Sequence, residues 1–297
     1  MALTMDIYTE HFGLRERPFT LVPNPDFLYW SPAHRRAAAV LEYGIITCAP
    51  ITLVTGEIGS GKTTLLRNLL RTAAEDIGEI RVGLISNPIG GRDELFRWVL
   101  MALDQDAPAD ATYVQLHRQL ETYLITQYAE GRRVVLIFDE AQNLDRASLE
   151  QVRMLTNINS DDNELVQLIL VGQPELRETI MRPDMVQLAQ RVSASFFLPA
   201  LKDGSVAEYI RHRLRIAGAE HEIFTPDSVE LIRQATGGVP RLINQLGDFA
   251  MLYAFENDTT RVTKETVQDV LNDGMFFAGG HTEPLRLVPS FDDTGSD

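Results

Sequence analysis

Apolar runs and amphipathic stretches alternate along the middle of this chain. From residue 51 to about residue 199, runs rich in branched apolar residues recur between stretches with apolar residues at helical spacing. This alternation is typical of a parallel sheet with helices on both faces. The pattern predicts strands at residues 51–54, 80–86, 134–138, 165–171 and 192–198. The helices predicted between them cover residues 64–71, 92–103, 112–128, 147–158 and 174–181.

The pattern changes after residue 199, where only helical periodicity remains. Amphipathic segments separated by Gly, Pro and Thr turns predict helices at residues 205–217, 226–235, 241–256 and 264–272. Thr225 and Pro226 give the second of these an N-cap and a proline at its first position. We therefore expect an α/β domain at residues 51–200, a small helical domain at 201–277 and a mobile acidic tail at 278–297.

Residues 1–50 are expected to pack on the α/β core as a leading segment. Their aromatic side chains can fix them there. Those residues are Phe12, Phe19, Phe27, Tyr29 and Trp30.

Composition and charge limit the function classes. The 297 residues are 44% hydrophobic, with a formal net charge of −15. No apolar run is long enough to cross a bilayer and the N-terminus does not resemble a signal peptide, so we expect a cytoplasmic protein. The acidic balance disfavours nucleic-acid binding by the whole surface, though not by a local basic patch. The single cysteine, Cys48, is expected to be a small buried hydrophobe without chemistry.

A phosphate-binding loop follows the first predicted strand. Residues 56–63 match the pattern G-x-x-x-x-G-K-[ST] and lie between a strand and a helix, whereas an ordinary glycine turn needs no such context. Lys62 is expected to reach the β and γ phosphates and Thr63 to bind Mg²⁺, so the chain is predicted to bind ATP with Mg²⁺. The predicted nucleotide-binding residues are Gly56, Glu57, Ile58, Gly59, Ser60, Gly61, Lys62, Thr63 and Thr64.

Two adjacent carboxylates end the third predicted strand. Asp139 and Glu140 follow the apolar run 134–138. An ATPase needs a carboxylate that holds magnesium and another that activates water at the carboxyl end of a central strand. We assign the metal to Asp139 and the general base to Glu140, with a solvated acidic turn as the alternative interpretation.

Several further short motifs accompany the phosphate loop along the chain. They are HFGL (11–14), PF (18–19), FLY (27–29), DEAQ (139–142), GQPEL (172–176), LAQR (188–191) and GVPRLIN (238–244). In this order they resemble the AAA+ superfamily and within it the secretion ATPases typified by general secretion pathway protein A. The resemblance covers residues 8–271 and implies a P-loop core with a helical lid. Transposition-regulator ATPases of the Mu activator kind are also related, so the resemblance specifies the ATPase better than its biological role.

The resemblance implies roles for three more polar residues. Gln173 is expected to orient the attacking water, Arg191 to be an arginine finger acting on a neighbouring subunit, and Arg241 to be a second sensor in the lid. The alternatives are a helix-entry residue for Gln173 and surface arginines for the other two. Arg177 and Arg182 are rival fingers.

The same resemblance implies that the leading segment borders the adenine, which makes His34 and Tyr43 base-pocket candidates. It also implies a homo-oligomer, a ring or filament formed on ATP binding, with an envelope-assembly protein as partner. The typical member continues into a transmembrane helix, whereas this chain ends in an acidic tail. We therefore expect no direct membrane insertion, and a location in the cytoplasm or at the inner membrane through a partner.

Three functions compete. The first is an ATP-driven switch or motor for assembly of an envelope secretion, polysaccharide export or pilus system. The second is an ATP-dependent DNA-binding regulator, supported by the basic cluster of Arg211, His212, Arg213 and Arg215. Arg213 points away from the face shared by Arg211 and Arg215, so the cluster makes a poor DNA-binding stripe. The third is a nucleotide-dependent scaffold with negligible turnover.

Overall fold

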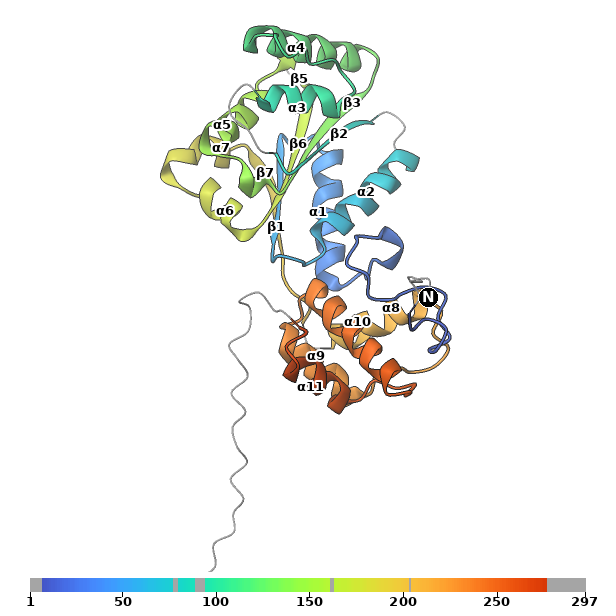
Figure 1. The fold of residues 1–297 in the computed structure, drawn as a ribbon. Coiled ribbons are helices and arrows are strands. Elements are labelled where there is room, and N and C mark those ends of the chain that lie inside the picture. The colour runs from blue at the N-terminus through green and yellow to red at the C-terminus, as the bar shows by residue number, and fades with distance from the viewer. Residues whose placement is uncertain (1–6, 77–79, 89–93, 161–162, 203, 277–297) are drawn as a thin grey trace, which may run out of the picture. The chain divides into compact units, whose positions relative to one another are not determined.

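The chain folds into two compact units, each with its own core (Figure 1). The computed structural model describes residues 7–76, 80–88, 94–160, 163–202 and 204–276. One unit comprises residues 22–200, and the other combines the N-terminal residues through 21 with the chain from residue 201 onward.

The larger unit contains a parallel sheet in the order β2-β3-β6-β1-β7. Each strand lies where the sequence predicts one. Their bounds are β1 Ile51–Gly56, β2 Ile80–Ser86, β3 Arg133–Asp139, β6 Val166–Gly172 and β7 Val192–Leu198. A short antiparallel pair, β4 Asn159–Ser160 and β5 Asn163–Glu164, was not predicted because two-residue strands leave no periodic signal.

Helices cover both faces of this sheet, which confirms the predicted fold class. Successive strand side chains point to opposite faces. Leu53 and Leu136 therefore join one buried cluster, and Val54 and Val135 join another. The first cluster is covered by α3 Glu94–Ala102, α4 Tyr113–Ala129, α5 Arg146–Leu155, α6 Pro174–Ile180 and α7 Val186–Ala189. The second is covered by α1 Pro32–Ile46 and α2 Lys62–Asp76.

Helix α1 was not predicted, although its start signal is present in the sequence. Ser31 caps it by accepting a hydrogen bond from the backbone N–H of His34, and Pro32 occupies its first position. Three short 3₁₀ helices also escaped prediction. They are η1 Pro25–Phe27, η2 Ala141–Asn143 and η3 Pro183–Met185.

The second unit is helical after residue 200, as predicted. The predicted Thr225 cap is present, since its side chain accepts a hydrogen bond from the backbone N–H of Ser228 at 3.3 Å. The helices are α8 Ser205–Ile216, α9 Pro226–Thr236, α10 Pro240–Glu256 and α11 Lys264–Asn272.

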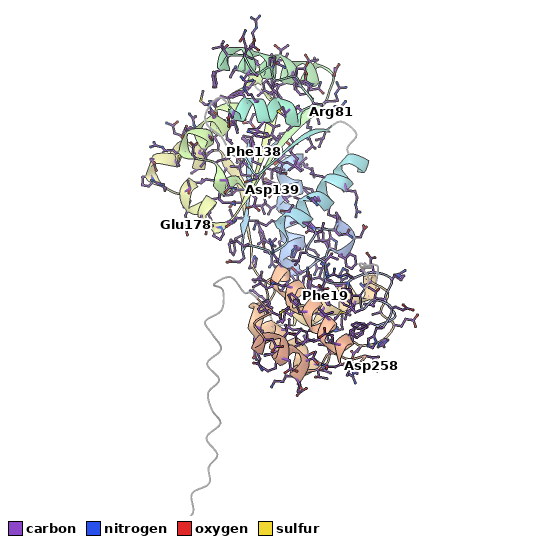
Figure 2. All side chains as sticks on the ribbon, in the orientation of Figure 1. Phe19, Arg81, Phe138, Asp139, Glu178 and Asp258 are labelled. Carbon is purple, nitrogen blue, oxygen red and sulfur yellow. The ribbon has the colours of Figure 1, made fainter. Side chains whose placement is uncertain are left out.

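The leading segment is divided between the units, so the expectation that residues 1–50 pack together on the α/β core needs correction. Residues 22–50 belong to the sheet unit, but residues 7–21 belong to the helical one. Phe19, labelled in Figure 2, is 1% exposed and its ring packs against Gly247 of α10. Arg213 of α8 donates a hydrogen bond to the carbonyl of Pro18, and Tyr8 and Arg17 both bond to Asp248. Apolar burial and these polar contacts explain the assignment to the helical unit.

Two other expectations about this region change. Cys48 is exposed with φ 54°, because the chain leaves α1 through a left-handed turn there. Trp30 is 39% exposed and therefore contributes little to fixing the segment, whereas Phe27 is 3% exposed. The predicted tail, residues 278–297, lies outside the described residues. Within the described chain, no helix is both long and apolar enough to cross a membrane.

Replacing Phe19 by alanine should destabilise the helical unit by about 3 kcal/mol, because it empties a fully buried aromatic site. Leu21→Ala is the matched control, since Leu21 is 52% exposed in the same segment. Urea unfolding followed by circular dichroism measures the change. Trp30 and Trp98 both belong to residues 22–200, so tryptophan fluorescence reports the other unit. Equal effects of the two substitutions would contradict the packing described.

Candidate functional site

The phosphate loop connects the end of β1 to the start of α2. Gly59 and Gly61 adopt φ values of 78° and 98°, a region that other residues rarely occupy. At Gly56 a side chain would collide with the backbone carbonyl of Leu198 in β7. The loop therefore needs glycine at these positions, and its last residue leads into a helix N-terminus that favours anions.

Lys62 is the first residue of α2 and is 7% exposed. Its Nζ donates hydrogen bonds to the carbonyl oxygens of Gly56 at 2.8 Å and Glu57 at 2.9 Å. Among the described residues the third ammonium hydrogen has no partner. Burial lowers the pKa of Lys62, and the nearby Glu140 and Asp139 oppose that shift. An anion beside the ammonium would relieve the cost of burying it.

Thr63 and Asp139 bring two oxygen ligands together. The Thr63 hydroxyl donates to Asp139 Oδ2 at 3.0 Å. This bond joins the start of α2 to the end of β3, where Asp139 is labelled in Figure 2. Burial raises the pKa of Asp139, while the hydrogen bond from Thr63 opposes the rise. Across the described residues there is no group of three or more acidic, His or Cys side chains that could hold a metal alone. A site of one carboxylate and one hydroxyl fits Mg²⁺, which usually takes its remaining ligands from phosphates and water.

Glu140 and Gln173, predicted to cooperate, lie within hydrogen-bonding distance. Gln173 Nε2 donates to Glu140 Oε2 at 3.2 Å. Gln142 also donates to Oε2, at 2.5 Å, and its own Oε1 accepts from the backbone N–H of Gln173 at 3.0 Å. Glu140 has φ 56°, so the chain turns sharply after β3 and brings its carboxylate to the end of β6. The parallel pairing of β3 with β6 makes this contact possible.

The role of Gln142 was missed in the sequence, although the residue belongs to the string DEAQ. Its side chain bridges Glu140 and Gln173, and Gly172 leaves room for it: a Cβ there would come within 2.8 Å of Gln142 Oε1. The sequence does contain a signal for this contact: a glycine within a strand, here Gly172, often marks the close approach of another group.

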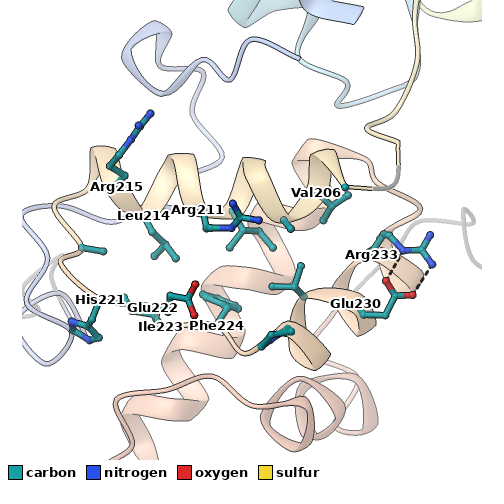
Figure 3. A pocket seen from close by; sticks show the side chains of 16 residues that line it. Val206, Arg211, Leu214, Arg215, His221, Glu222, Ile223, Phe224, Glu230 and Arg233 are labelled. Atoms are coloured by element: carbon teal, nitrogen blue, oxygen red, sulfur yellow. Dashed lines mark hydrogen bonds and ion pairs between the residues drawn. The ribbon is translucent and has the colours of Figure 1, made fainter. Parts of the chain in front are cut away.

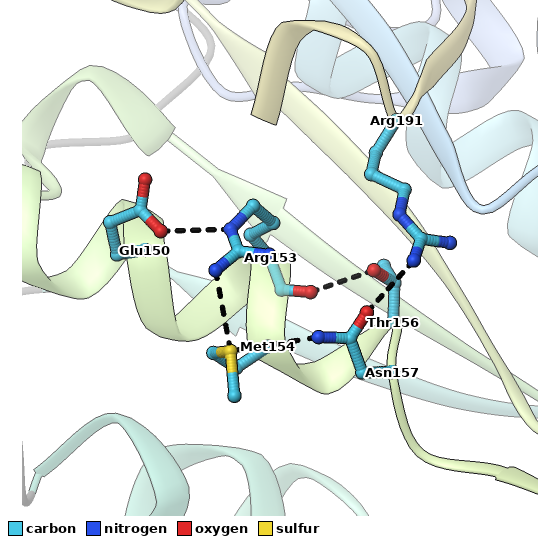
Figure 4. A network of polar contacts seen from close by, with 6 residues as sticks. All are labelled: Glu150, Arg153, Met154, Thr156, Asn157 and Arg191. Atoms are coloured by element: carbon cyan, nitrogen blue, oxygen red, sulfur yellow. Dashed lines mark hydrogen bonds and ion pairs between the residues drawn. The ribbon is translucent and has the colours of Figure 1, made fainter. Parts of the chain in front are cut away.

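Arg191 lies next to the amino ends of β1 and β7, whereas the phosphate loop follows the carboxyl end of β1. Figure 4 shows its side chain beside Asn157. Arg191 precedes β7, whose first residue, Val192, pairs with Ile51 at the start of β1. Its Nη2 donates to Asn157 Oδ1 at 2.9 Å, and Nη1 lies 3.7 Å from Glu164 Oε1. Strand β1 is six residues long and ends at Gly56, so about 20 Å of strand separates Arg191 from the phosphate loop. Arg191 therefore does not approach the phosphate loop of its own chain.

The rival arginines occupy different surroundings. Arg177 is exposed on α6, which starts directly after Gln173. Arg182 is exposed, and its Nε lies 3.4 Å from Asp184 Oδ1. Neither position excludes a contact with a neighbouring subunit, so the choice among the three arginines remains a prediction.

Three predicted residues remain, two in the sheet unit and one in the helical unit. His34 is 4% exposed and its ring contacts the phosphate loop at Ser60. Tyr43 is 58% exposed on α1, so its ring is not buried against the core. Arg241 is exposed in the first turn of α10 in the helical unit, and its role as a second sensor stays a prediction.

Comparison with known proteins agrees with this arrangement. A family model described as an AAA domain matches residues 47–180. General secretion pathway protein A of Aeromonas hydrophila is 38% identical over 256 residues, which make up 86% of this chain and 46% of that protein. This chain belongs to the AAA ATPase family of general secretion pathway protein A. It spans about half the length of that relative.

Solved structures share the AAA ATPase fold at low sequence identity. Cdc6p from Pyrobaculum aerophilum has a TM-score of 0.66 and 16% identity, with 89% of this chain and 70% of that chain covered. The ORC2 protein of Aeropyrum pernix, solved in ADPNP-ADP complexes, has a TM-score of 0.62 and 18% identity, with 84% and 72% covered. At such identities the likeness concerns the fold alone.

The basic cluster of the helical unit is divided: Figure 3 shows Arg211 and Arg215 among the residues around a pocket, and Arg213 does not line that pocket. Arg213 is buried at 7% exposure, where it bonds the Pro18 carbonyl and the Tyr209 hydroxyl. Arg211 and Arg215 border a pocket of about 400 Å³ that Glu222 and Glu230 also line. Hydrogen bonds from Arg233 lower the pKa of Glu230 to about 2, so a carboxylate persists in this pocket wall. The mixed charge does not favour a nucleic-acid groove.

Asp139→Asn should raise the melting temperature of the nucleotide-free protein at pH 7. Burial raises the Asp139 pKa above its unfolded value. The ionised carboxylate therefore destabilises the fold once pH exceeds that folded pKa, and the penalty vanishes below the unfolded pKa. Thermal melts at decreasing pH should show the advantage of asparagine shrinking through this window.

Asp145→Asn, at the N-cap of α5, is the contrasting control. Hydrogen bonds from Ser148 lower the pKa of Asp145, so its replacement should make the protein less stable at pH 7. A lower melting temperature for Asp139→Asn at pH 7 would contradict the electrostatics described.

Proposed function

We propose that this chain binds ATP with Mg²⁺ and hydrolyses it as an oligomer. The observation that carries the proposal is the convergence of Lys62, Thr63, Asp139, Glu140 and Gln173 on the carboxyl ends of β1, β3 and β6. Ligands of open α/β sheets bind at this edge. A solvated acidic turn does not account for a buried lysine, a buried aspartate and a glutamate held by two amides.

Each group has a chemical task in this proposal. Loop amides and the Lys62 ammonium hold the β and γ phosphates, and Thr63 with Asp139 holds Mg²⁺. The metal, when bound, neutralises charge that develops on the phosphate oxygens. Gln142 and Gln173 both bond Glu140 Oε2, so Oε1 can accept a proton from the attacking water. The side-chain amide of Gln173, alone or together with that of Gln142, holds the water in line with the bond to be broken.

The position of Arg191 supports the oligomeric part of the proposal. At about 20 Å of strand length from the loop in its own chain, its guanidinium can serve only a nucleotide bound by another subunit. Asn157 and Glu164 hold the side chain at the surface with 37% of it exposed. ATP bound by a neighbour would give Arg191 an anionic partner, so ATP should favour a ring or filament.

The biological role that we propose is assembly of a cell-envelope secretion, polysaccharide export or pilus system. The similarity to general secretion pathway protein A supports it, with an envelope-assembly protein as partner and a location in the cytoplasm or at the inner membrane through that partner. DNA binding is the alternative, since fold neighbours include a Drosophila ORC structure bound to DNA. The burial of Arg213 and the mixed charge beside Arg211 do not support that alternative.

Glu140→Gln should bind ATP as tightly as the wild type but hydrolyse it at least about 100-fold more slowly. The amide keeps the shape of the carboxylate and loses its basicity. Phosphate release under saturating ATP measures turnover, and titration calorimetry measures binding. Glu178→Gln, an exposed position on α6, is the control and should remain active. An unchanged rate for Glu140→Gln would move the base to another residue.

Arg191→Ala should bind ATP normally and hydrolyse it poorly, because the finger acts on a neighbour. Mixing it with Glu140→Gln should restore activity, since an Arg191→Ala subunit supplies the base and a Glu140→Gln subunit supplies the finger. In a random 1:1 mixture, one interface in four joins an intact base to an intact finger. The recovery should therefore be roughly a quarter of wild-type turnover. If no activity returns after demonstrated subunit exchange, Arg191 is not the finger. The same mixture made with Arg177→Ala or Arg182→Ala tests those rivals.

A further inference from the structure

His34 makes a contact between α1 and the phosphate loop that has no part in the ATPase mechanism proposed above. It occupies the third position of α1, and the residue is 4% exposed. Nε2 lies 3.2 Å from the backbone oxygen of Ser60, and Nδ1 lies 2.7 Å from the Ser31 hydroxyl. A Cβ on Gly61 would stand only 3.0 Å from Nε2. The ring therefore packs directly against the Ser60–Gly61 peptide.

The hydrogen-bond partners fix one state of this ring. A carbonyl oxygen can only accept, so Nε2 must carry the hydrogen that Ser60 receives. In the neutral ring Nδ1 is then an acceptor, and the Ser31 hydroxyl donates to it while accepting from the His34 backbone N–H. Burial lowers the pKa of His34, which favours the neutral ring. Both ring nitrogens are thus occupied, and neither is left for the edge of an adenine base.

The contact also determines the direction of a loop amide. The Ser60–Gly61 peptide is trans, so its C=O and N–H point in opposite directions. Holding the Ser60 oxygen toward His34 turns the Gly61 N–H away from α1. Among the described residues this N–H has no hydrogen-bond partner. Lys62, the next residue, begins the helix whose N-terminus attracts anions.

We propose that His34 is a positioning residue that orients the Gly61 N–H toward the phosphates of the bound nucleotide. The inference rests on the proposed function, because it needs a nucleotide in this loop. It replaces the expectation that His34 contacts the base. Ser31 contributes to the same arrangement, since its hydroxyl donates to Nδ1 and so stabilises the tautomer whose Nε2–H faces Ser60.

The test compares ADP with AMP, because a misdirected loop amide weakens binding of the polyphosphate more than binding of the monophosphate. His34→Leu keeps an apolar ring-sized group and removes the donor, and should weaken ADP binding about tenfold, the scale of one hydrogen bond. AMP affinity should change by less than about threefold. His34→Gln keeps an N–H donor near the position of Nε2 and should restore most of the ADP affinity.

Titration calorimetry with ADP and AMP gives these constants, and melting temperatures of the free proteins check folding. Ser31→Ala keeps the ring and should show a smaller selective loss for ADP, which tests the inference if His34→Leu does not fold. Unchanged ADP affinity in the folded variants would overturn the inference, and so would equal losses for ADP and AMP, which indicate a base contact. A wild-type protein that binds neither nucleotide would instead refute the proposed function.

Discussion

The pairing of β6 between β1 and β3 is the constraint on which the site depends. Because all three strands run parallel, their carboxyl ends meet at one edge, which brings the phosphate loop, the Asp139–Glu140 pair and Gln173 together. The residues come from distant parts of the sequence, and no local interaction could assemble them. A strand order in which β3 and β6 were separated would remove the bond between Glu140 and Gln173.

Burial then gives these polar groups their chemistry. Lys62 and Asp139 lie almost fully inside the unit, where burial lowers the pKa of the first and raises that of the second. Such groups cost stability in the absence of a ligand, as is common in sites that must bind charge. Neighbouring side chains hold these groups in place: His34 contacts the loop at the Ser60 oxygen, and Gln142 joins Glu140 to Gln173.

Local periodicity and motif spacing were sufficient to predict the sheet strands and the helices after residue 200. The motifs also singled out Lys62, Asp139 and Gln173, whose roles stay predictions. Periodicity and motifs failed where contacts between residues far apart in the sequence determine the position of a side chain. Phe19 and Pro18 looked like part of a segment on the α/β core, but Gly247 and Arg213 hold them on the helical unit. Cys48 looked apolar and buried, although the left-handed turn after α1 exposes it. His34 and Gln142 form contacts whose partners are 26 and 31 residues away, and spacing does not reveal such pairs.

The central claim is that the loop at Lys62 holds the phosphates of a nucleotide. Equilibrium binding of ATP with Mg²⁺ to the wild type and to Lys62→Ala tests it most directly, with Lys264→Ala, an exposed lysine of α11, as the control. The account predicts saturable binding by the wild type and the control, and loss of measurable binding in Lys62→Ala because the ammonium facing the phosphates is gone. Wild-type affinity in Lys62→Ala would contradict it.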